Sequence, residues 1–369
     1  MLLLSVILLS VIGIVAVYSA SNYTSAQDYG TPFYFTVKQT EGVLIGAACM
    51  ILTANINYHR YKKLGILLIF IGLIILALAI VPGLSVEVYG AKRWINLGLF
   101  TIQPSEISKF CFVAFAAGYF AAKPERVKTF KGILPVLAAG GATCFLIIIE
   151  PNMSITVCVG AVMLIMLFMA GVKKRFLALI LVPIMLLMPV LIIIEPYRLK
   201  RLSAFLDPWQ SPKGEGYQLL QSLYGLGSGD FFGVGLFNSR QKFRFLPFSE
   251  SDFILSVIGE EIGFIGTALI FILMFFVIIR GIKAAANCKD YFGYLLATGI
   301  TAVYAVQVTV NALVVTGSIP PTGLPLPLIS AGNTSIIVFM AAFGVLYNIS
   351  KNPEEKILPS KGTLRPTIS

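Results

Sequence analysis

The chain has 369 residues, of which 57% are hydrophobic and only 12% carry a charge. A soluble domain carries about 25% charged residues, which it needs to cover its surface. This composition therefore excludes a cytosolic enzyme, a secreted module and a disordered protein, and it indicates a polytopic helical membrane protein. The net charge of +11 is expected to set orientation and lipid contacts. No nucleic-acid-binding motif is present, so no nucleic-acid partner is expected.

Apolar stretches of span length recur along the chain and predict an all-α fold with about ten transmembrane helices. We place these spans at residues 2–20, 34–54, 65–83, 104–122, 133–150, 154–171, 176–195, 252–279, 292–316 and 334–349. Lys and Arg are concentrated in every second short loop and in the tail, which by the positive-inside rule places both termini in the cytoplasm. We therefore expect one transmembrane domain over 1–350 and a cytoplasmic tail over 351–369.

The long segment 196–251, between the seventh and eighth spans, is predicted to be a large extracytoplasmic loop. Its basic side chains alternate with aromatic ones, which is typical of a surface that lies on the bilayer and meets an anionic group. The alternative is an interfacial segment that aromatic rings and lipid phosphates hold in place. The loop cations that we expect to meet this group include Arg198, Arg201, Arg240 and Lys242.

Asp252 is the sharpest catalytic candidate, because it stands where a polar run meets the apolar run that begins at Phe253. A carboxylate at the outer membrane surface can accept a proton from a bound hydroxyl group. The spacing of Ser249 and Asp252 also fits a capping box at the start of a helix, so a structural role stays open.

Three further acidic candidates lie within predicted spans. Glu106 follows Pro104 in a first helical turn, and Lys109 shares its helix face, so this pair is either functional or a structural ion pair. Glu260 and Glu261 lie about two turns beyond Asp252, where they can line a polar cavity or bond to neighbouring helices.

Two outer segments complete the set of candidates. Arg93, beside Trp94, can bind a phosphate group or anchor the chain at the interface. The proline-rich segment 317–332 cannot form a regular helix and must be shielded by protein or line a cavity. The five cysteines and the single histidine suggest neither a disulfide framework nor a metal site.

A set of motifs then occurs in order along almost the whole chain. They are Arg93-Trp-Ile-Asn96, Gln103-Pro-Ser-Glu106, Gly214-Glu-Gly-Tyr-Gln218, Asn238-Ser-Arg-Gln-Lys242, Asp252-Phe-Ile254, Gly259-Glu-Glu-Ile-Gly263, Pro320-Pro-Thr-Gly323 and Pro327-Leu-Ile-Ser330. With these motifs the chain resembles the SEDS family (shape, elongation, division and sporulation), and it is closer to the FtsW/SpoVE branch than to RodA. It differs from the usual family pattern at Asn152, Phe248, Ala331 and Asn333.

The resemblance implies peptidoglycan glycosyltransfer, in which lipid II is polymerised into undecaprenyl-linked glycan strands at the outer face of the bacterial cytoplasmic membrane. By matching motifs, the family's required aspartate corresponds to Asp252 and its intramembrane Glu/Lys pair to Glu106 and Lys109. The residues then expected to bind substrate are Arg93, the loop residues Arg198, Arg201, Gln218, Arg240 and Lys242, and Ser330 in the motif after the prolines. The resemblance also implies a class B penicillin-binding protein, a transpeptidase, as partner.

Two other functions stay open on the sequence alone, a flippase or transporter of lipid-linked precursors and a non-catalytic scaffold of the division or elongation machinery. No cofactor is implied with certainty. Lys109, the loop arginines or a divalent cation such as Mg²⁺ or Mn²⁺ can stabilise a departing diphosphate.

Overall fold

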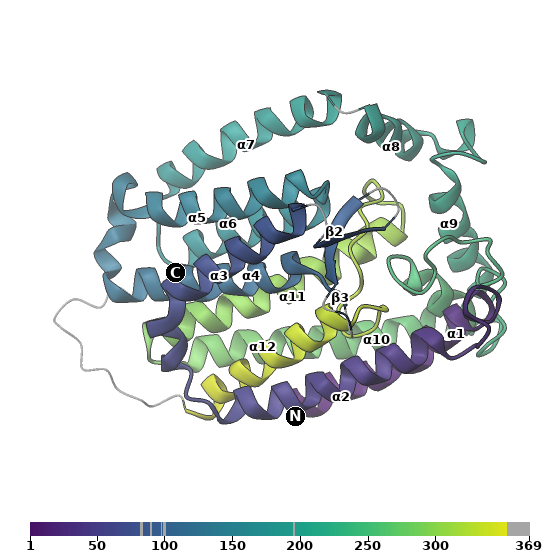
Figure 1. The fold of residues 1–369 in the computed structure, drawn as a ribbon, viewed down its shortest axis with the longest axis horizontal. Coiled ribbons are helices and arrows are strands. Elements are labelled where there is room, and N and C mark those ends of the chain that lie inside the picture. Colours follow the sequence, from purple (N-terminus) through teal and green to yellow (C-terminus); the bar gives the residue numbers. More distant parts are fainter. Residues whose placement is uncertain (82–83, 89–90, 97, 99–100, 195, 353–369) are drawn as a thin grey trace. The chain divides into compact units, whose positions relative to one another are not determined.

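The computed structural model describes residues 1–81, 84–88, 91–96, 98, 101–194 and 196–352, and the described chain is mainly helical (Figure 1). The helices that match the ten predicted spans are α1 (Leu2–Tyr29), α2 (Tyr34–Asn55), α3 (His59–Ile80), α4 (Pro104–Ala122), α5 (Phe130–Ile149), α6 (Met153–Met169), α7 (Lys174–Ile194), α10 (Ile254–Asn287), α11 (Tyr291–Val315) and α12 (Asn333–Lys351). All ten predicted spans therefore coincide with helices, and α1 continues about two turns beyond its predicted end.

In the described part of the chain, seven helices are both long and apolar enough to cross a membrane. They are α1, α2, α3, α5, α10, α11 and α12, and α6 is apolar but only 17 residues long. The chain is thus a multi-pass membrane protein, while the number of ten crossings stays a prediction. The predicted tail lies outside the described residues from 353 onward.

The chain forms two compact units, which are described separately. The first unit contains residues 1–50, 182–278 and 304–341, and the second contains 51–181, 279–303 and the part that begins at 342. The prediction of a single transmembrane domain is not tested by this division.

In the second unit, α3 packs closely against α4 through two glycines. A Cβ added at Gly65 would meet the carbonyl oxygen of Ala114 at 3.3 Å, and one added at Gly72 would meet Cβ of Cys111 at 3.1 Å. Small residues let transmembrane helices approach closely, so the glycines are the reason for this contact. Other α3 side chains, including Ile66 and Phe70, are exposed and apolar, as lipid contact requires.

A small antiparallel sheet precedes α4 and was not expected from the sequence. Its strands are β1 (Ser85–Val88), β2 (Ala91–Asn96) and β3 (Thr101–Ile102), in the order β1-β2-β3 (Figure 1). Ser85 pairs with Ile95, and Asn96 pairs with Thr101. The sheet places Arg93 on its central strand, β2.

In the first unit, α10 is interrupted at Gly263, whose φ of 64° and ψ of −169° are not helical. The segment 229–235 bonds to the backbone at this interruption: Val234 N donates to Glu260 O at 2.9 Å, and Phe264 N donates to Asp230 O at 2.8 Å. Backbone groups released inside a membrane protein need such internal partners. The interruption is therefore part of the architecture that attaches the long loop to α10.

The predicted loop 196–251 is partly helical. It contains α8 (Pro196–Leu206), the short 3-10 helix η2 (Pro208–Gln210) and α9 (Tyr217–Gly229). The remainder, from Asp230 to Phe253, is irregular and leads directly to the start of α10.

Candidate functional site

Asp252 lies two residues before the first residue of α10, and its side chain is partly exposed. The N-terminal end of a helix carries partial positive charge, which stabilises an ionised carboxylate. The proline-rich segment lies beside this carboxylate, because a Cβ added at Gly323 would stand 3.2 Å from Oδ2 of Asp252. This position suits a proton acceptor, because the carboxylate is accessible from outside and the neighbouring segment limits its movement. The role of general base stays a prediction.

The polar run before Asp252 is attached to two other parts of the first unit. The Ser249 hydroxyl donates to the carbonyl oxygen of Ala20 in α1 at 3.2 Å. The Ser330 hydroxyl donates to the carbonyl oxygen of Ser251 at 2.6 Å and accepts from the Leu326 amide at 2.7 Å. Ser330 is buried, and these two hydrogen bonds hold the segment that carries Asp252. Its predicted contact with substrate is untested.

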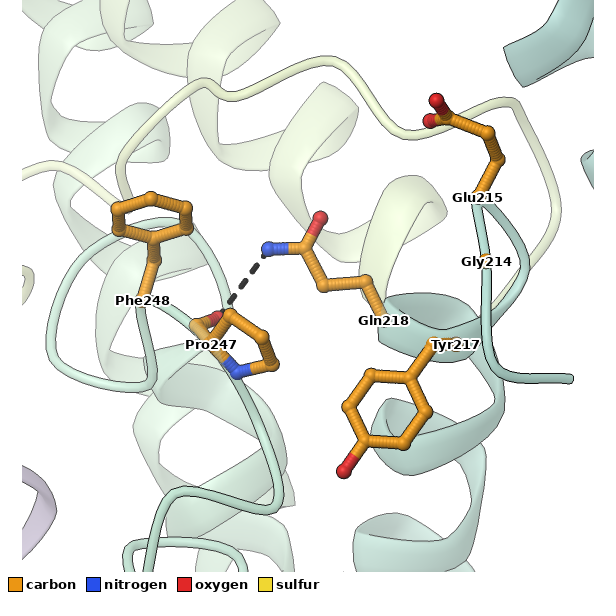
Figure 2. Close-up of a pocket in the computed structure, with 6 residues that line it drawn as sticks. All are labelled: Gly214, Glu215, Tyr217, Gln218, Pro247 and Phe248. Carbon is orange, nitrogen blue, oxygen red and sulfur yellow. Dashed lines mark hydrogen bonds between the residues drawn. The ribbon is translucent and has the colours of Figure 1, made fainter. Parts of the chain in front are cut away.

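A pocket of about 220 Å³ opens where the start of α9 meets the chain shortly before Asp252. It is lined by Gly214, Glu215, Tyr217, Gln218, Pro247 and Phe248. The Gln218 side chain donates from Nε2 to the Pro247 carbonyl oxygen at 3.2 Å, and Figure 2 shows it between the rings of Tyr217 and Phe248. The pocket is open rather than enclosed, and it combines two aromatic rings with a few polar groups, a lining that small-molecule sites share. The structure thus places the predicted substrate residue Gln218 in a pocket.

The predicted loop cations have different surroundings. Arg201 donates from Nη1 to the Pro321 carbonyl oxygen at 3.2 Å, which links α8 to the proline-rich segment. Lys242 is buried, and its ammonium group donates to the Phe237 carbonyl oxygen. Arg240 has an exposed side chain, while the side chain of Arg198 lies outside the described residues. Of the predicted substrate-binding cations whose side chains are described, Arg240 is therefore the one most available to a ligand.

Glu260 and Glu261 bond to neighbouring elements, which is one of the two roles that their position in the sequence allowed. The Glu260 carboxylate accepts hydrogen bonds from the Ser239 hydroxyl and from the amides of Arg240 and Gln241. The Glu261 carboxylate accepts from the Ser19 hydroxyl of α1 at 2.5 Å and from the Ser239 amide at 3.2 Å. Both side chains are buried and hold the loop against α10, and their predicted place in a polar cavity is untested.

In the second unit, Glu106 and Lys109 form a buried ion pair in the first turns of α4. The Lys109 ammonium group lies 2.9 Å from Oε1 of Glu106, and the two residues are 1% and 0% exposed. Oε2 of Glu106 has no hydrogen-bond partner among the described residues. The predicted pairing is confirmed, and the predicted catalytic role is not tested.

Arg93 fastens the turn between α5 and α6. Its Nε donates to the Glu150 carbonyl oxygen at 3.1 Å, and its Nη2 donates to the Pro151 carbonyl oxygen at 2.5 Å. Asn152 caps α6 by accepting from the Ile155 amide at 3.3 Å. These contacts favour a structural role for Arg93, and phosphate binding by it stays a prediction.

Burial raises the pKa of the Glu150 carboxyl group to about 8, and the nearby Arg93 charge opposes this rise only in part. Glu150 lies just outside α5, which ends at Ile149, and both of its carboxyl oxygens are buried without a partner among the described residues. A group with this environment is uncharged over much of the neutral range.

The described residues do not gather three or more His, Cys, Asp or Glu side chains into a possible metal site. A divalent cation would need such a donor set or substrate phosphates to complete its coordination. A divalent cation that stabilises the departing diphosphate therefore stays a prediction.

Sequence reasoning missed two residues of the Asp252 environment, Asn311 and Gly323. Asn311 is a polar side chain inside an apolar span, which is rare enough to be a usable signal. Gly323 has a φ of 75°, which glycine adopts without strain, but glycine alone does not reveal which group approaches it. An exposed ion pair between Asp28 of α1 and Arg244 was also not foreseen.

The FtsW/RodA/SpoVE family of cell cycle proteins matches residues 1–355 of the chain. A probable peptidoglycan glycosyltransferase FtsW from Trichlorobacter lovleyi is 40% identical over 353 residues, which cover 95% of this chain and 92% of that protein. Stage V sporulation protein E from Bacillus subtilis is 37% identical over 354 residues, with coverage of 95% and 96%.

The fold has a counterpart among solved structures. A chain of a peptidoglycan synthase complex, described for its structural coordination of polymerization and crosslinking, superposes with a TM-score of 0.79 and 25% identity. The match covers 96% of this chain and 98% of that one. Family, relatives and fold agree, and the chain is a member of the FtsW/RodA/SpoVE family of membrane proteins.

Proposed function

We propose that the protein is a peptidoglycan glycosyltransferase that polymerises lipid II into glycan strands at the outer face of the bacterial cytoplasmic membrane. The observation that carries this proposal is the position of Asp252. Its partly exposed carboxylate stands at the N-terminal end of a membrane helix, on a segment that hydrogen bonds hold in place. The similarity to a probable peptidoglycan glycosyltransferase over 95% of the chain supports the same activity.

The reaction requires a base and a way to stabilise a leaving group. The Asp252 carboxylate takes the proton from the 4-hydroxyl of one lipid-linked sugar, and the oxygen attacks C1 of the other. The bond between C1 and the diphosphate oxygen breaks, and undecaprenyl diphosphate departs with the bonding electrons. Diphosphate is a good leaving group, so cationic side chains suffice to stabilise it. Arg240 is the described candidate, since its side chain is exposed.

The pocket around Gln218 is the proposed site for a polar part of the substrate. Its two rings, Tyr217 and Phe248, offer flat apolar surfaces, and the Gln218 carboxamide offers hydrogen bonds (Figure 2). Phe248 stands only four residues before Asp252. Binding here would hold the substrate near the base without contributing to proton transfer.

Purified wild type and Asp252→Asn should be compared in a gel-based assay that follows lipid II polymerisation in detergent without an ion gradient. Loss of a general base typically lowers the rate about 10²–10⁴-fold. The control is Asp207→Asn, because Asp207 lies in the same loop and caps η2 through a contact that asparagine can also make. Polymerisation within a few-fold of wild type by folded Asp252→Asn would refute the base assignment.

The partner of this enzyme is proposed to be a class B penicillin-binding protein that cross-links the new strands. Support comes from the structural neighbour, which belongs to a complex that coordinates polymerization and crosslinking. Co-purification with each such transpeptidase of the host tests this, and failure with all of them would count against it.

The two other functions predict different results, which a vesicle assay and a cellular phenotype measure. A flippase moves labelled lipid II across vesicles and forms no polymer. A scaffold keeps its division or cell-shape phenotype when Asp252 or Glu106 is replaced.

A further inference from the structure

Three consecutive carbonyl groups that lead up to Asp252 are each held by a separate donor. The Ala331 amide donates to Glu250 O at 2.9 Å, and the Ser330 hydroxyl donates to Ser251 O at 2.6 Å. The Asn311 carboxamide donates from Nδ2 to Asp252 O at 2.9 Å. The backbone that carries the proposed base is therefore fixed, although it belongs to no helix or strand.

Asn311 has a second contact that makes it different from the other two donors. Its Nδ2 also donates to the Leu324 carbonyl oxygen at 2.7 Å, and its side chain is 1% exposed within α11. Both acceptors are carbonyl groups, so the carboxamide nitrogen must face them. One side chain thus joins α11, the Asp252 backbone and the proline-rich segment.

The segment bound through Leu324 is the one that lies beside the Asp252 carboxylate. Gly323, the preceding residue, would place an added Cβ 3.2 Å from Oδ2 of Asp252. Asn311 therefore holds both the backbone of the base and the adjacent wall that limits where its carboxylate can move.

This arrangement has a cost in stability. Oδ1 of Asn311 is buried and has no partner among the described residues. An unsatisfied buried acceptor typically costs about 1–3 kcal/mol. An apolar residue at this position would avoid that cost, but it would leave the carbonyl groups of Asp252 and Leu324 without this donor.

We infer that Asn311 is a positioning residue that holds Asp252 in the geometry required for proton abstraction. The inference rests on the proposed function, because it acts through the base assigned there. Displacement of a catalytic group by about 1 Å can cost about 10²-fold in rate. Asn311 itself does not touch the substrate in this account.

The matched control is Gln307, one turn earlier on α11. Gln307 is also buried, and its Nε2 donates to the Pro325 carbonyl oxygen at 3.0 Å. Gln307→Ala therefore removes a comparable bond to the same segment and leaves both hydrogen bonds of Asn311 in place.

The experiment measures kcat and KM for lipid II polymerisation by Asn311→Ala and Gln307→Ala, with thermal unfolding in detergent to compare stability. We expect Asn311→Ala to lower kcat about 10–100-fold with KM changed less than about threefold. Gln307→Ala should destabilise the protein similarly but lower kcat less than about threefold. Equal kcat for the two variants, or a change confined to KM, would overturn the inference.

Gly323→Ala provides a second variant if Asn311→Ala does not fold. The added methyl group would push against Oδ2 of Asp252 from the wall side, and the expected result is again a loss of kcat with little change in KM. Unchanged kcat in this variant would also overturn the inference. Activity of Asp252→Asn would instead refute the base assignment, so the two failures are distinguishable.

Discussion

At the scale of single residues, Glu150 is the group whose burial has the most direct consequence for pH dependence. Its pKa rises from 4.5 to about 8, chiefly because burial disfavours the charged carboxylate. The folded protein therefore binds the Glu150 proton more tightly than the unfolded chain does. The stability that this provides is complete below about pH 4.5 and is lost as pH rises to about 8.

Replacement of Glu150 by glutamine should remove this dependence. We expect the unfolding temperature of wild type in detergent to fall between pH 5 and pH 8.5 and that of Glu150→Gln to fall less. Each kcal/mol corresponds to about 2–4 °C for a large domain. Glu125→Gln, at an exposed position of the same unit, should keep the wild-type slope. Parallel curves for wild type and Glu150→Gln would contradict the prediction.

The buried pair of Glu106 and Lys109 leads to a prediction that separates structure from function. Lys109→Met leaves the Glu106 charge without its partner, and loss of one member of a buried pair costs about 3–5 kcal/mol. The double variant Glu106→Gln with Lys109→Met should recover most of this stability, because no uncompensated charge remains. Thermal unfolding of the single and double variants measures the difference, and a stable Lys109→Met protein would disprove it.

The same double variant tests the proposed catalytic role of the pair. A stable protein that no longer polymerises lipid II would support a functional role. Polymerisation at the wild-type rate would show that the pair serves the fold alone.

At the scale of elements, the contact between α3 and α4 depends on the absence of a side chain at Gly72. A methyl group there would come within 3.1 Å of the Cys111 side chain and 3.4 Å of the Ser108 backbone. We expect Gly72→Ala to lower stability by about 1–3 kcal/mol through overpacking. The control is Gly141→Ala in α5, which has open space and should be neutral or stabilising by up to about 1 kcal/mol. Equal unfolding temperatures for the two variants would show that α4 moves away at little cost.

The interruption of α10 at Gly263 is a feature that the hydrophobic pattern of the sequence does not predict. The span 252–279 was correctly predicted as helical, but Gly263 did not by itself indicate a break. The break exists because residues 229–235 supply hydrogen bonds to the freed backbone. That partnership joins positions about thirty residues apart, and no local pattern reports it.

At the scale of the whole molecule, the predicted orientation can be tested by cysteine labelling. Lys128 and Lys213 are both exposed, and the basic loops place Lys128 inside and Lys213 outside. In a background without the five native cysteines, Lys213→Cys should react with a membrane-impermeant maleimide on intact cells. Lys128→Cys should react only after permeabilisation. The reverse pattern would show that the topology is inverted. Reaction of both cysteines on intact cells would show that the predicted number of crossings between them is wrong.

The candidate site was foreseen in part. Asp252 was identifiable because a carboxylate directly before an apolar run stands out, and the pairing of Glu106 with Lys109 followed from helical spacing. The surroundings of the loop cations were not foreseen, since Lys242 is buried against the Phe237 carbonyl group. Side chains in an irregular segment follow no period from which their direction can be read.

The sequence by itself determined the helical spans, since the apolar length needed to cross a bilayer is a local property of the chain. It also determined where Asp252 stands relative to a membrane helix. Only the tertiary structure decided what holds that residue, because Asn311 follows it by 59 positions and reaches it through a hydrogen bond. Such bonds depend on which distant segments lie side by side in the folded chain, and composition and periodicity describe only local properties of the sequence.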